Sequence, residues 1–206
     1  MVHLLVATTN RGKQREFQDL LADWPVEIVF PQDLGLEIEV KEEGNSFADI
    51  ATHKAMAYAQ ASHMLTLADD SGLEVDALAG APGVYTARYA GPGASDEDRY
   101  RKLLAALGHT PPEERTARFR CTVALAHPEQ GIAVAEGTCE GRIAYEPRGT
   151  MGFGYDPVFW LPQFGCTMAQ LHPARKNQVS HRARAVRAAR HLLDRMLEDG
   201  EEARDA

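Results

Sequence analysis

The chain has 206 residues, enough for one medium domain or for two lobes that share a core. Its composition, 44% hydrophobic and 25% charged, is ordinary for a soluble globular protein. A net charge of -8 argues against general nucleic-acid binding, which needs a large basic surface. The sequence has no apolar stretch of the ~20 residues that span a membrane. We therefore expect neither nucleic acid nor membrane as a partner.

The first hundred residues predict alternating strands and helices. A strand over 3–7 precedes a helix that Pro25 closes, and a second strand covers 26–30. Ser46 is typical of a helix N-cap, and a further strand over 64–68 ends in the predicted turn Asp69-Asp70-Ser71-Gly72. A glycine-rich loop and a helix over 96–107 follow. This β-α-β order favours an α/β fold.

The second half predicts a long hairpin and a final helix. Alternating strands over 117–126 and 132–145 flank a turn. A helix covers 180–197, and the charged tail 198–206 is expected to fray. No linker separates independent domains, so residues 1–197 are interpreted as one domain. The three cysteines are far apart, which suggests neither a disulfide framework nor a metal pair and favours the reducing cytoplasm.

The loop after the first strand is a candidate phosphate site. It consists of small polar residues and two cations at a helix N-terminus, where backbone N–H groups and a positive dipole end favour anions: Thr8, Thr9, Asn10, Arg11, Gly12 and Lys13. The alternative is an ordinary capped turn. The Walker A pattern is absent, so this is not a phosphate loop of that kind.

Acidic residues form the second candidate site. Asp69 and Asp70 are adjacent at a predicted strand end, and adjacent carboxylates are costly unless a cation neutralises them. With Glu42 they favour Mg²⁺, which prefers carboxylate oxygens, although a solvated turn explains the pair equally well. Lys54 interrupts the apolar face of its own helix, so it either reaches water or borders an anionic pocket.

Two further stretches suggest a nucleoside pocket. Gly152-Phe153-Gly154-Tyr155-Asp156-Pro157 combines flexible backbone with rings that can stack on a base, although packing of those rings into the core is the alternative. Lys176 and Ser180-His181-Arg182 place cations where we expect the first turn of a helix, against its dipole. Arg and His donors suit a purine oxygen at position 6, but a solvated basic face is also possible.

Taken together and in order, these motifs resemble the inosine/xanthosine triphosphate pyrophosphatase family, also called non-canonical purine NTP pyrophosphatases. The resemblance runs from Val6 to about Arg187 and also includes Ala81-Pro82-Gly83-Val84-Tyr85-Thr86-Ala87-Arg88-Tyr89. It implies an elongated mixed α/β sheet with flanking helices, two lobes around a central nucleotide-binding cleft, and a homodimer. It also implies Mg²⁺-dependent hydrolysis of ITP, dITP and XTP to the monophosphate and pyrophosphate.

The resemblance assigns roles to the candidate residues. Asp70 is the catalytic base and, with Glu42, binds Mg²⁺. Residues 8–13 hold the triphosphate. Beyond the resemblance, Lys54 is a candidate phosphate contact and Asp69 a supporting carboxylate whose role the sequence leaves open. The nucleotide contacts are Ser71, Phe153, Gly154, Tyr155, Asp156, Lys176, His181 and Arg182.

Two positions depart from the family pattern, because Ile50 replaces the usual Asn and Gln170 the usual Glu. Both bear on fine geometry rather than on the class of activity. A pyrophosphatase for other modified nucleotides and a non-catalytic nucleotide-binding regulator are the competing hypotheses.

Overall fold

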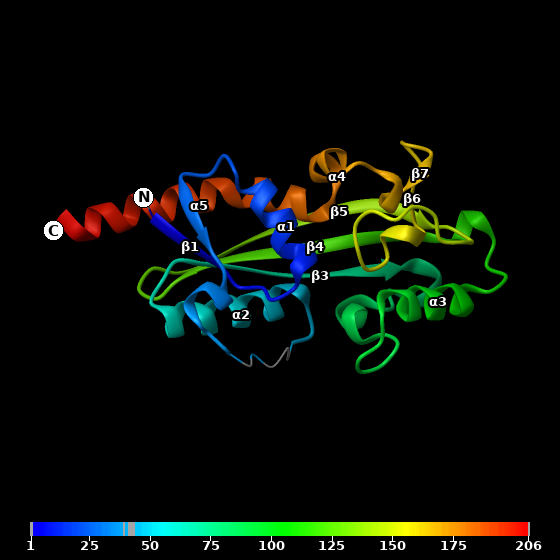
Figure 1. Cartoon of the computed structure of the whole chain (residues 1–206), viewed down its shortest axis with the longest axis horizontal. Coiled ribbons are helices and arrows are strands. Elements are labelled where there is room, and N and C mark those ends of the chain that lie inside the picture. The colour runs from blue at the N-terminus through cyan, green and yellow to red at the C-terminus, as the bar shows by residue number, and fades with distance from the viewer. Residues whose placement is uncertain (1, 39, 41–43, 206) are drawn as a thin grey trace. The chain divides into compact units, whose positions relative to one another are not determined.

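The computed structural model describes residues 2–38, 40 and 44–205, with the side chains described up to Glu198 (Figure 1). Its strands are β1 (Val2–Val6), β2 (Val26–Val29), β3 (Thr66–Val75), β4 (Thr116–His127), β5 (Gly131–Ile143), β6 (Phe159–Leu161) and β7 (Cys166–Thr167). Its α-helices are α1 (Arg11–Leu20), α2 (Phe47–Ser62), α3 (Asp96–Leu107), α4 (Pro173–Val179) and α5 (His181–Asp205).

The strands form one seven-stranded sheet in the order β2-β1-β3-β4-β5-β6-β7. β1 pairs in parallel with β2 and β3, whereas β6 pairs antiparallel with both β5 and β7. Parallel neighbours joined by a helix and antiparallel neighbours joined by short turns are the two usual connections of a mixed sheet. The predicted α/β fold with a mixed sheet and flanking helices is confirmed.

The chain divides into two compact units. Unit 1 contains Met1–Asp70, Cys121–Gly137 and Arg182–Ala206, and unit 2 contains Ser71–Arg120 and Thr138–His181. β3, β4 and β5 each contribute residues to both units.

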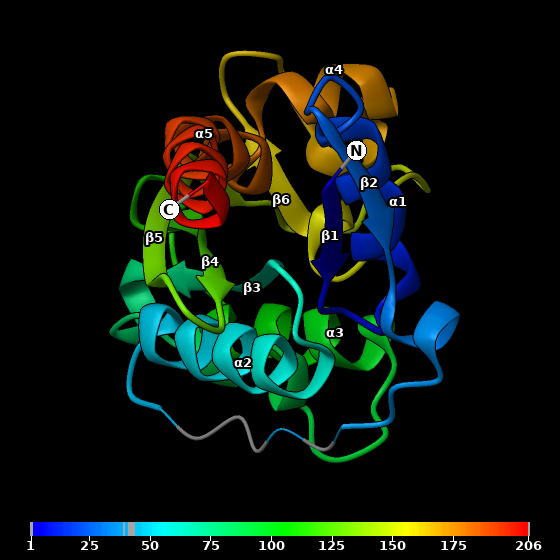
Figure 2. The ribbon, with the colours of Figure 1, turned by 90° about the vertical axis from the view of Figure 1, so that its left-hand side faces the viewer.

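Unit 1 has helices on both faces of its strands. Figures 1 and 2 show α1 and α5 on one face and α2 on the other. Leu67 packs in a cluster with residues of α1 and α5, whereas its neighbour Ala68 packs in a cluster with residues of α2. Because side chains alternate along a strand, Asp69 is directed to the α1/α5 face and Asp70 to the α2 face.

Unit 2 has a separate core. Leu103 and Leu107 of α3 are buried together with Leu73 of β3, Phe119 of β4 and Phe159 of β6. The aromatic rings of Phe119 and Phe159 lie 4.4 Å apart at the centroids and are tilted by 45°, a favourable geometry for an aromatic pair. This core supports the loop from 149 to 158 that carries part of the candidate site.

Most of the predicted elements are confirmed. Ser46 caps α2 by accepting a hydrogen bond from the backbone N–H of Asp49, α3 has the predicted bounds, and β4 and β5 are joined by a short turn. The short elements α4, β6 and β7 were not predicted, because two to seven residues give little periodicity. No described helix is long and apolar enough to cross a membrane.

Two predictions about element ends are wrong. β3 does not end at Ala68 but continues to Val75, so Asp69-Asp70-Ser71-Gly72 is part of a strand rather than a turn. Turn-forming residues are tolerated there because buried neighbours such as Leu67 and Leu73 hold the segment in the sheet. The predicted frayed tail is helical, since α5 continues to Asp205.

Candidate functional site

The loop between β1 and α1 is organised by Asn10. Its side-chain oxygen accepts hydrogen bonds from the backbone N–H groups of Gly12 at 2.8 Å and Lys13 at 3.1 Å, and thereby caps α1. The Thr8 hydroxyl in turn accepts from the Asn10 N–H at 3.2 Å. The capped turn is therefore present. It also places the exposed residues Thr9, Asn10 and Arg11 at the positive end of α1, as the phosphate hypothesis requires.

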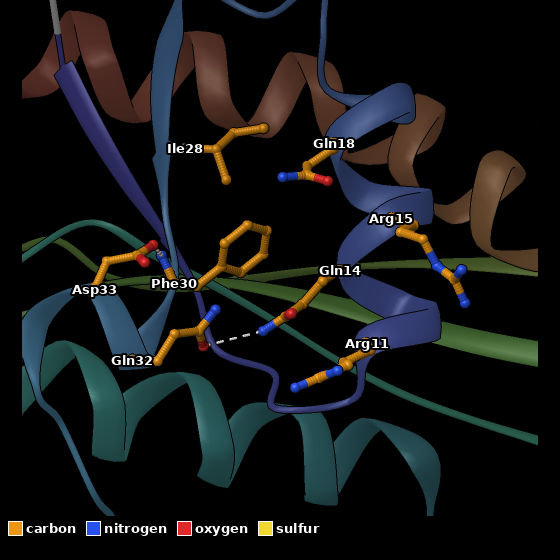
Figure 3. Close-up of a pocket in the computed structure, with 8 residues that line it drawn as sticks. All are labelled: Arg11, Gln14, Arg15, Gln18, Ile28, Phe30, Gln32 and Asp33. Carbon is orange, nitrogen blue, oxygen red and sulfur yellow. Dashed lines mark hydrogen bonds between the residues drawn. The ribbon is translucent and has the colours of Figure 1, made fainter.

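Arg11 and Lys13 lie in different surroundings although both belong to this loop. Figure 3 shows the Arg11 side chain beside a pocket of about 520 Å³, formed by α1, β2 and the turn after β2. Gln14 crosses this pocket by donating a hydrogen bond to Gln32 at 3.0 Å. The pocket is lined by Arg11, Gln14, Arg15, Gln18, Ile28, Phe30, Gln32 and Asp33. The predicted contact of Arg11 with the triphosphate stays a prediction.

Lys13 belongs to a buried ion network around Asp69. Its Nζ lies 3.0 Å from Asp69 Oδ1, and the Asp69 side chain is completely buried. Arg182 donates to the other oxygen, Oδ2, from Nη2 at 2.9 Å and from Nε at 3.2 Å. The Nη1 of Arg182 lies 2.5 Å from Glu16 Oε2. The Asp69 carboxylate thus fixes two of the predicted binding residues, Lys13 of α1 and Arg182 of α5.

This network also explains why Arg182 is tolerated in the first turn of α5. A cation at that position opposes the helix dipole. Here Asp69 and Glu16 both compensate the guanidinium, whose side chain is only 1% exposed. Asp69 and Glu16 both bind Arg182 and fix its position in the structure. This supports a positioning role for Arg182. Its predicted contact with the base stays a prediction.

The charges in the network shift one another's pKa. Burial alone would raise the pKa of Asp69, but Lys13, Arg182 and Lys54 lower it far below its usual value. Burial opposes the charged form of Arg182, yet Asp69 and Glu16 raise its pKa overall. Burial, and then the charge of Asp69, raise the pKa of Cys121, whose sulfur lies 3.8 Å from Asp69 Oδ2. Asp69 is therefore ionised and Cys121 is a neutral thiol at neutral pH.

Lys54 of α2 contacts the backbone of β3 next to Asp70. Lys54 Nζ donates a hydrogen bond of 2.6 Å to the carbonyl oxygen of Asp69, which belongs to the peptide that joins Asp69 to Asp70. Lys54 is half-buried, and its ammonium group binds this strand, while its predicted place beside an anionic pocket stays a prediction. Asp70 is half-buried as well, so its carboxylate is not sequestered in the way that Asp69 is. This difference fits Asp70, and not Asp69, for contact with a ligand.

The predicted Mg²⁺ ligands are Glu42 and Asp70. Glu42 lies outside the described residues, and within the described part of the chain no three His, Cys, Asp or Glu side chains group around a possible metal position. Asp70 supplies one half-buried carboxylate on the α2 face, a donor type that a hard cation prefers. The donor chemistry of Asp70 fits Mg²⁺, and the complete ligand set stays a prediction.

In unit 2 the centre of the candidate site is the ion pair of Asp156 and Lys176. Both residues are buried, at 2% and 5% exposure. Lys176 Nζ pairs with Asp156 Oδ2, and the same oxygen accepts the backbone N–H of Phe153 at 3.0 Å. Lys176 lies in the last turn of α4, where a cation is favourable, so the expected conflict with a helix dipole does not apply to it.

The glycine and aromatic residues of this loop have separate surroundings. A Cβ on Gly152 would lie 2.0 Å from Asp156 Oδ2, so the close approach requires glycine. Gly154 donates its N–H to Asp96 at 2.7 Å. The Lys176 ammonium lies 4.9 Å from the centroid of the half-buried Phe153 ring, within cation–π range. These contacts hold the loop in one conformation.

Tyr155 occupies the core of unit 2. It is 2% exposed, and its hydroxyl donates to the Thr86 carbonyl oxygen at 3.0 Å. Packing into the core was the alternative interpretation for this loop, and it describes Tyr155 correctly. Phe153 is therefore the better candidate for stacking on a base, while the predicted Tyr155 contact stays a prediction.

The remaining predicted residues in unit 2 are His181 and Ser71. His181 is 5% exposed and its ring stacks on Phe119 with 4.7 Å between centroids. Ser71 is half-buried in β3. At the positions that depart from the family pattern, Ile50 is buried, and Gln170 accepts the Thr167 N–H at 2.9 Å, which caps a short turn. Gln170 therefore stabilises the local backbone.

Two residues that the sequence did not suggest complete these networks. Glu16 follows Lys13 by three positions, so both lie on one face of α1, and this spacing was a usable signal. Asp96 was expected only as the start of a helix, and its contact with Gly154 joins positions 58 apart. No local pattern predicts a contact of that range.

The chain is similar to known proteins over most of its length. The Ham1 family model matches residues 4–192. The dITP/XTP pyrophosphatase of Desulforamulus reducens is 48% identical over 193 residues, covering 94% of this chain and 96% of the relative. That of Geobacillus kaustophilus is 50% identical over 186 residues, covering 90% and 91%.

Solved structures are similar as well. The HAM1 protein of Coxiella burnetii has a TM-score of 0.85 at 38% identity, covering 95% of this chain and 100% of the other. The Ham1 protein of Staphylococcus aureus has a TM-score of 0.83 at 40% identity, covering 93% and 98%. The match of the family model and the identity to these relatives extend over nearly the whole chain, which therefore belongs to the Ham1 family.

Proposed function

We propose that this protein hydrolyses non-canonical purine nucleoside triphosphates, namely ITP, dITP and XTP, to the monophosphate and pyrophosphate. The observation that carries the proposal is the Asp69 network, which holds Lys13 directly behind the capped N-terminus of α1. A fixed ammonium at the positive end of the α1 dipole suits a polyphosphate. Relatives named dITP/XTP pyrophosphatase support the choice of substrate.

Asp70 acts as the general base in this proposal. It positions and deprotonates the water that attacks in line, and Lys13 and Lys54 stabilise the charge that grows on the departing phosphates. Glu42 and Asp70 would hold a Mg²⁺ ion. When bound, this ion withdraws negative charge from the phosphate oxygens. Asp69 does not act on water, since its buried carboxylate binds Lys13 and Arg182.

Selection of the base uses the second set of residues. The Phe153 ring provides a stacking surface, and the donors of Lys176, His181 and Arg182 favour a 6-oxo purine over the 6-amino group of adenine. Asp156 holds Lys176 in place. The competing hypotheses of a different nucleotide substrate or of a non-catalytic regulator predict different results in the assay that follows.

The decisive experiment measures pyrophosphate release from ITP, dITP, XTP, GTP and ATP, with Mg²⁺ and with EDTA. We expect Mg²⁺-dependent turnover of the first three with kcat/KM well above that for ATP. Asp70→Asn lowers kcat by about 10²–10⁴-fold. The control Asp194→Asn removes an exposed carboxylate of α5 that pairs with Arg190, and it retains wild-type kcat. Binding without turnover would favour the regulator, and similar kcat/KM for ITP and ATP would exclude the proposed base selection.

The proposal extends to the setting of the enzyme. Cys121, Cys139 and Cys166 are all free thiols, which suits the reducing cytoplasm. We further propose a homodimer, on the basis of the family resemblance. Light scattering coupled to size-exclusion chromatography tests the dimer, and a monomer mass at micromolar concentration would contradict it.

A further inference from the structure

Unit 2 contains a pocket that includes none of the candidate catalytic or nucleotide-binding residues. Its volume is about 300 Å³, at the small end of the range for ligand sites. It is lined by Pro112, Arg115, Arg142, Ile143, Ala144, Tyr145, Glu146, Arg148 and Trp160. These include three guanidinium groups and one carboxylate, so the lining has a net charge of +2. We call it the Arg115 pocket.

Arg115 is a buried cation whose contacts are all uncharged. It is 2% exposed and donates to the carbonyl oxygens of Ile143 at 2.9 Å, Ala144 at 3.0 Å and Thr110 at 3.5 Å. The ring of Tyr145 covers it at 4.4 Å. Among the described residues no carboxylate pairs with it. Burial lowers the pKa of Arg115, yet a guanidinium stays charged in proteins. A buried charge without a counterion favours an anion at the pocket.

The strand register adds an aromatic wall and a second cation. Arg142 of β5 is directly opposite Trp160 of β6 in an antiparallel pair, so both side chains lie on one face of the sheet. Their neighbours Ile143 and Phe159 are buried in the core on the other face. Arg142 is exposed and forms no ion pair with any described residue, whereas Arg148 pairs with Glu146 at 2.7 Å. Arg142 is thus the cation most accessible to a ligand.

We propose that the Arg115 pocket binds a small molecule that combines one planar aromatic ring with a phosphate or carboxylate group. Trp160 and the 57% exposed Tyr145 supply ring-stacking surfaces, Arg142 supplies donors for the anion, and the buried charge of Arg115 adds to the positive potential of the pocket. The pocket is too small for a large ligand but matches a single ring with one anionic substituent. The proposal is independent of the proposed pyrophosphatase activity, because no residue is shared.

The test follows the indole N–H signals of the full chain by NMR, since its two tryptophans are Trp24 in unit 1 and Trp160 in the pocket. Phenyl phosphate and benzoate are the probes, with phenol as the uncharged ring and inorganic phosphate and acetate as the two anions alone. We expect saturable movement of the Trp160 signal while the Trp24 signal stays in place. The better probe should bind at least about 10-fold more tightly than phenol or its own anion alone, because ring and anion contacts act together. The two probes distinguish a phosphate from a carboxylate ligand.

Arg142→Gln should weaken binding of the better probe about 10-fold or more, since it removes a charge-assisted hydrogen bond. Its matched control is Arg101→Gln, an exposed arginine of α3 in the same unit, which should change nothing. Lys13→Gln should also leave the Trp160 titration unchanged. Equal affinity for inorganic phosphate, acetate or phenol alone, movement of Trp24 instead of Trp160, or unchanged affinity in Arg142→Gln would overturn the proposal. A backbone amide spectrum of each free variant that overlays that of the wild type away from the substituted residue verifies that the fold is intact.

Discussion

Arg182 Nη2 lies 2.9 Å from Asp69 Oδ2, and neither side chain is more than 1% exposed. These residues are 113 positions apart in the chain. A buried pair of this kind is costly to break, because the remaining partner keeps an uncompensated charge. Asp69 serves three cations at once, since Lys13 binds its carboxylate and Lys54 its carbonyl oxygen.

The first prediction concerns Asp69 and stability. Asp69→Asn should lower the free energy of unfolding by about 3–5 kcal/mol, the usual cost of breaking a buried ion pair. Urea unfolding followed by circular dichroism measures it. Asp70→Asn, in the next position but half-buried, should cost less than about 1 kcal/mol. Equal losses in the two variants would contradict the different roles assigned to the two carboxylates.

The second prediction concerns the stability of the fold at acidic pH. The pKa of Asp69 is lowered in the folded state, so its stabilisation is complete above the unfolded pKa of about 3.9 and is lost progressively as the pH falls below that value. The urea midpoint of the wild type should therefore decrease from pH 5 toward pH 2.5. Asp69→Asn should show a shallower decrease. If the urea midpoints of the wild type and of Asp69→Asn decreased with pH at the same slope, Asp69 would not be the source of this pH dependence.

A third prediction addresses the ion pair in unit 2. Asp156→Asn leaves the Lys176 ammonium buried and should cost about 3–5 kcal/mol in unfolding free energy. Lys176→Met should be similarly costly. The double variant should lose clearly less than the two losses added together, because it leaves no buried charge unpaired. Additive losses in this double-mutant cycle would show that the two side chains do not interact.

The fourth prediction separates packing from substrate contact at Tyr155. Tyr155→Phe removes the hydrogen bond to Thr86 and should cost about 0.5–1.5 kcal/mol, with the KM for ITP unchanged. Phe153→Ala should instead raise the KM, because a stacked base contributes about 1–3 kcal/mol. The control is Tyr100→Phe at a half-buried tyrosine of α3. A raised KM in Tyr155→Phe would assign the tyrosine to the substrate.

Thiol reactivity provides a fifth prediction. Cys121 and Cys139 are buried, and burial raises the pKa of Cys121, so both should resist a thiol reagent such as DTNB in the folded protein. Cys166 is only partly buried and should react first. Counting released chromophore before and after denaturation gives one fast thiol and then three. A fast thiol that persists in Cys166→Ser would contradict the assignment.

Local patterns predicted much of the fold. Ser46 caps α2, α3 begins after Ser95, and much of β5 in the long hairpin alternates between buried and more exposed side chains. These features depend on residues within a few positions of one another, which is the range that propensity and periodicity describe. The limits of local patterns also explain the wrong prediction of a turn within β3. Asp69 to Gly72 has the composition of a turn, but its buried neighbours hold it in a strand.

The sequence by itself determined the family, the order of most elements and the set of polar candidate residues. Tertiary structure decided what each of those residues does. Asp69 and Asp70 are indistinguishable as adjacent letters, but a strand directs them to opposite faces, one toward Lys13 and Arg182 and the other toward α2. Burial and long-range ion pairs, which no local pattern contains, made one carboxylate a fixed counterion and left the other only half-buried on the opposite face.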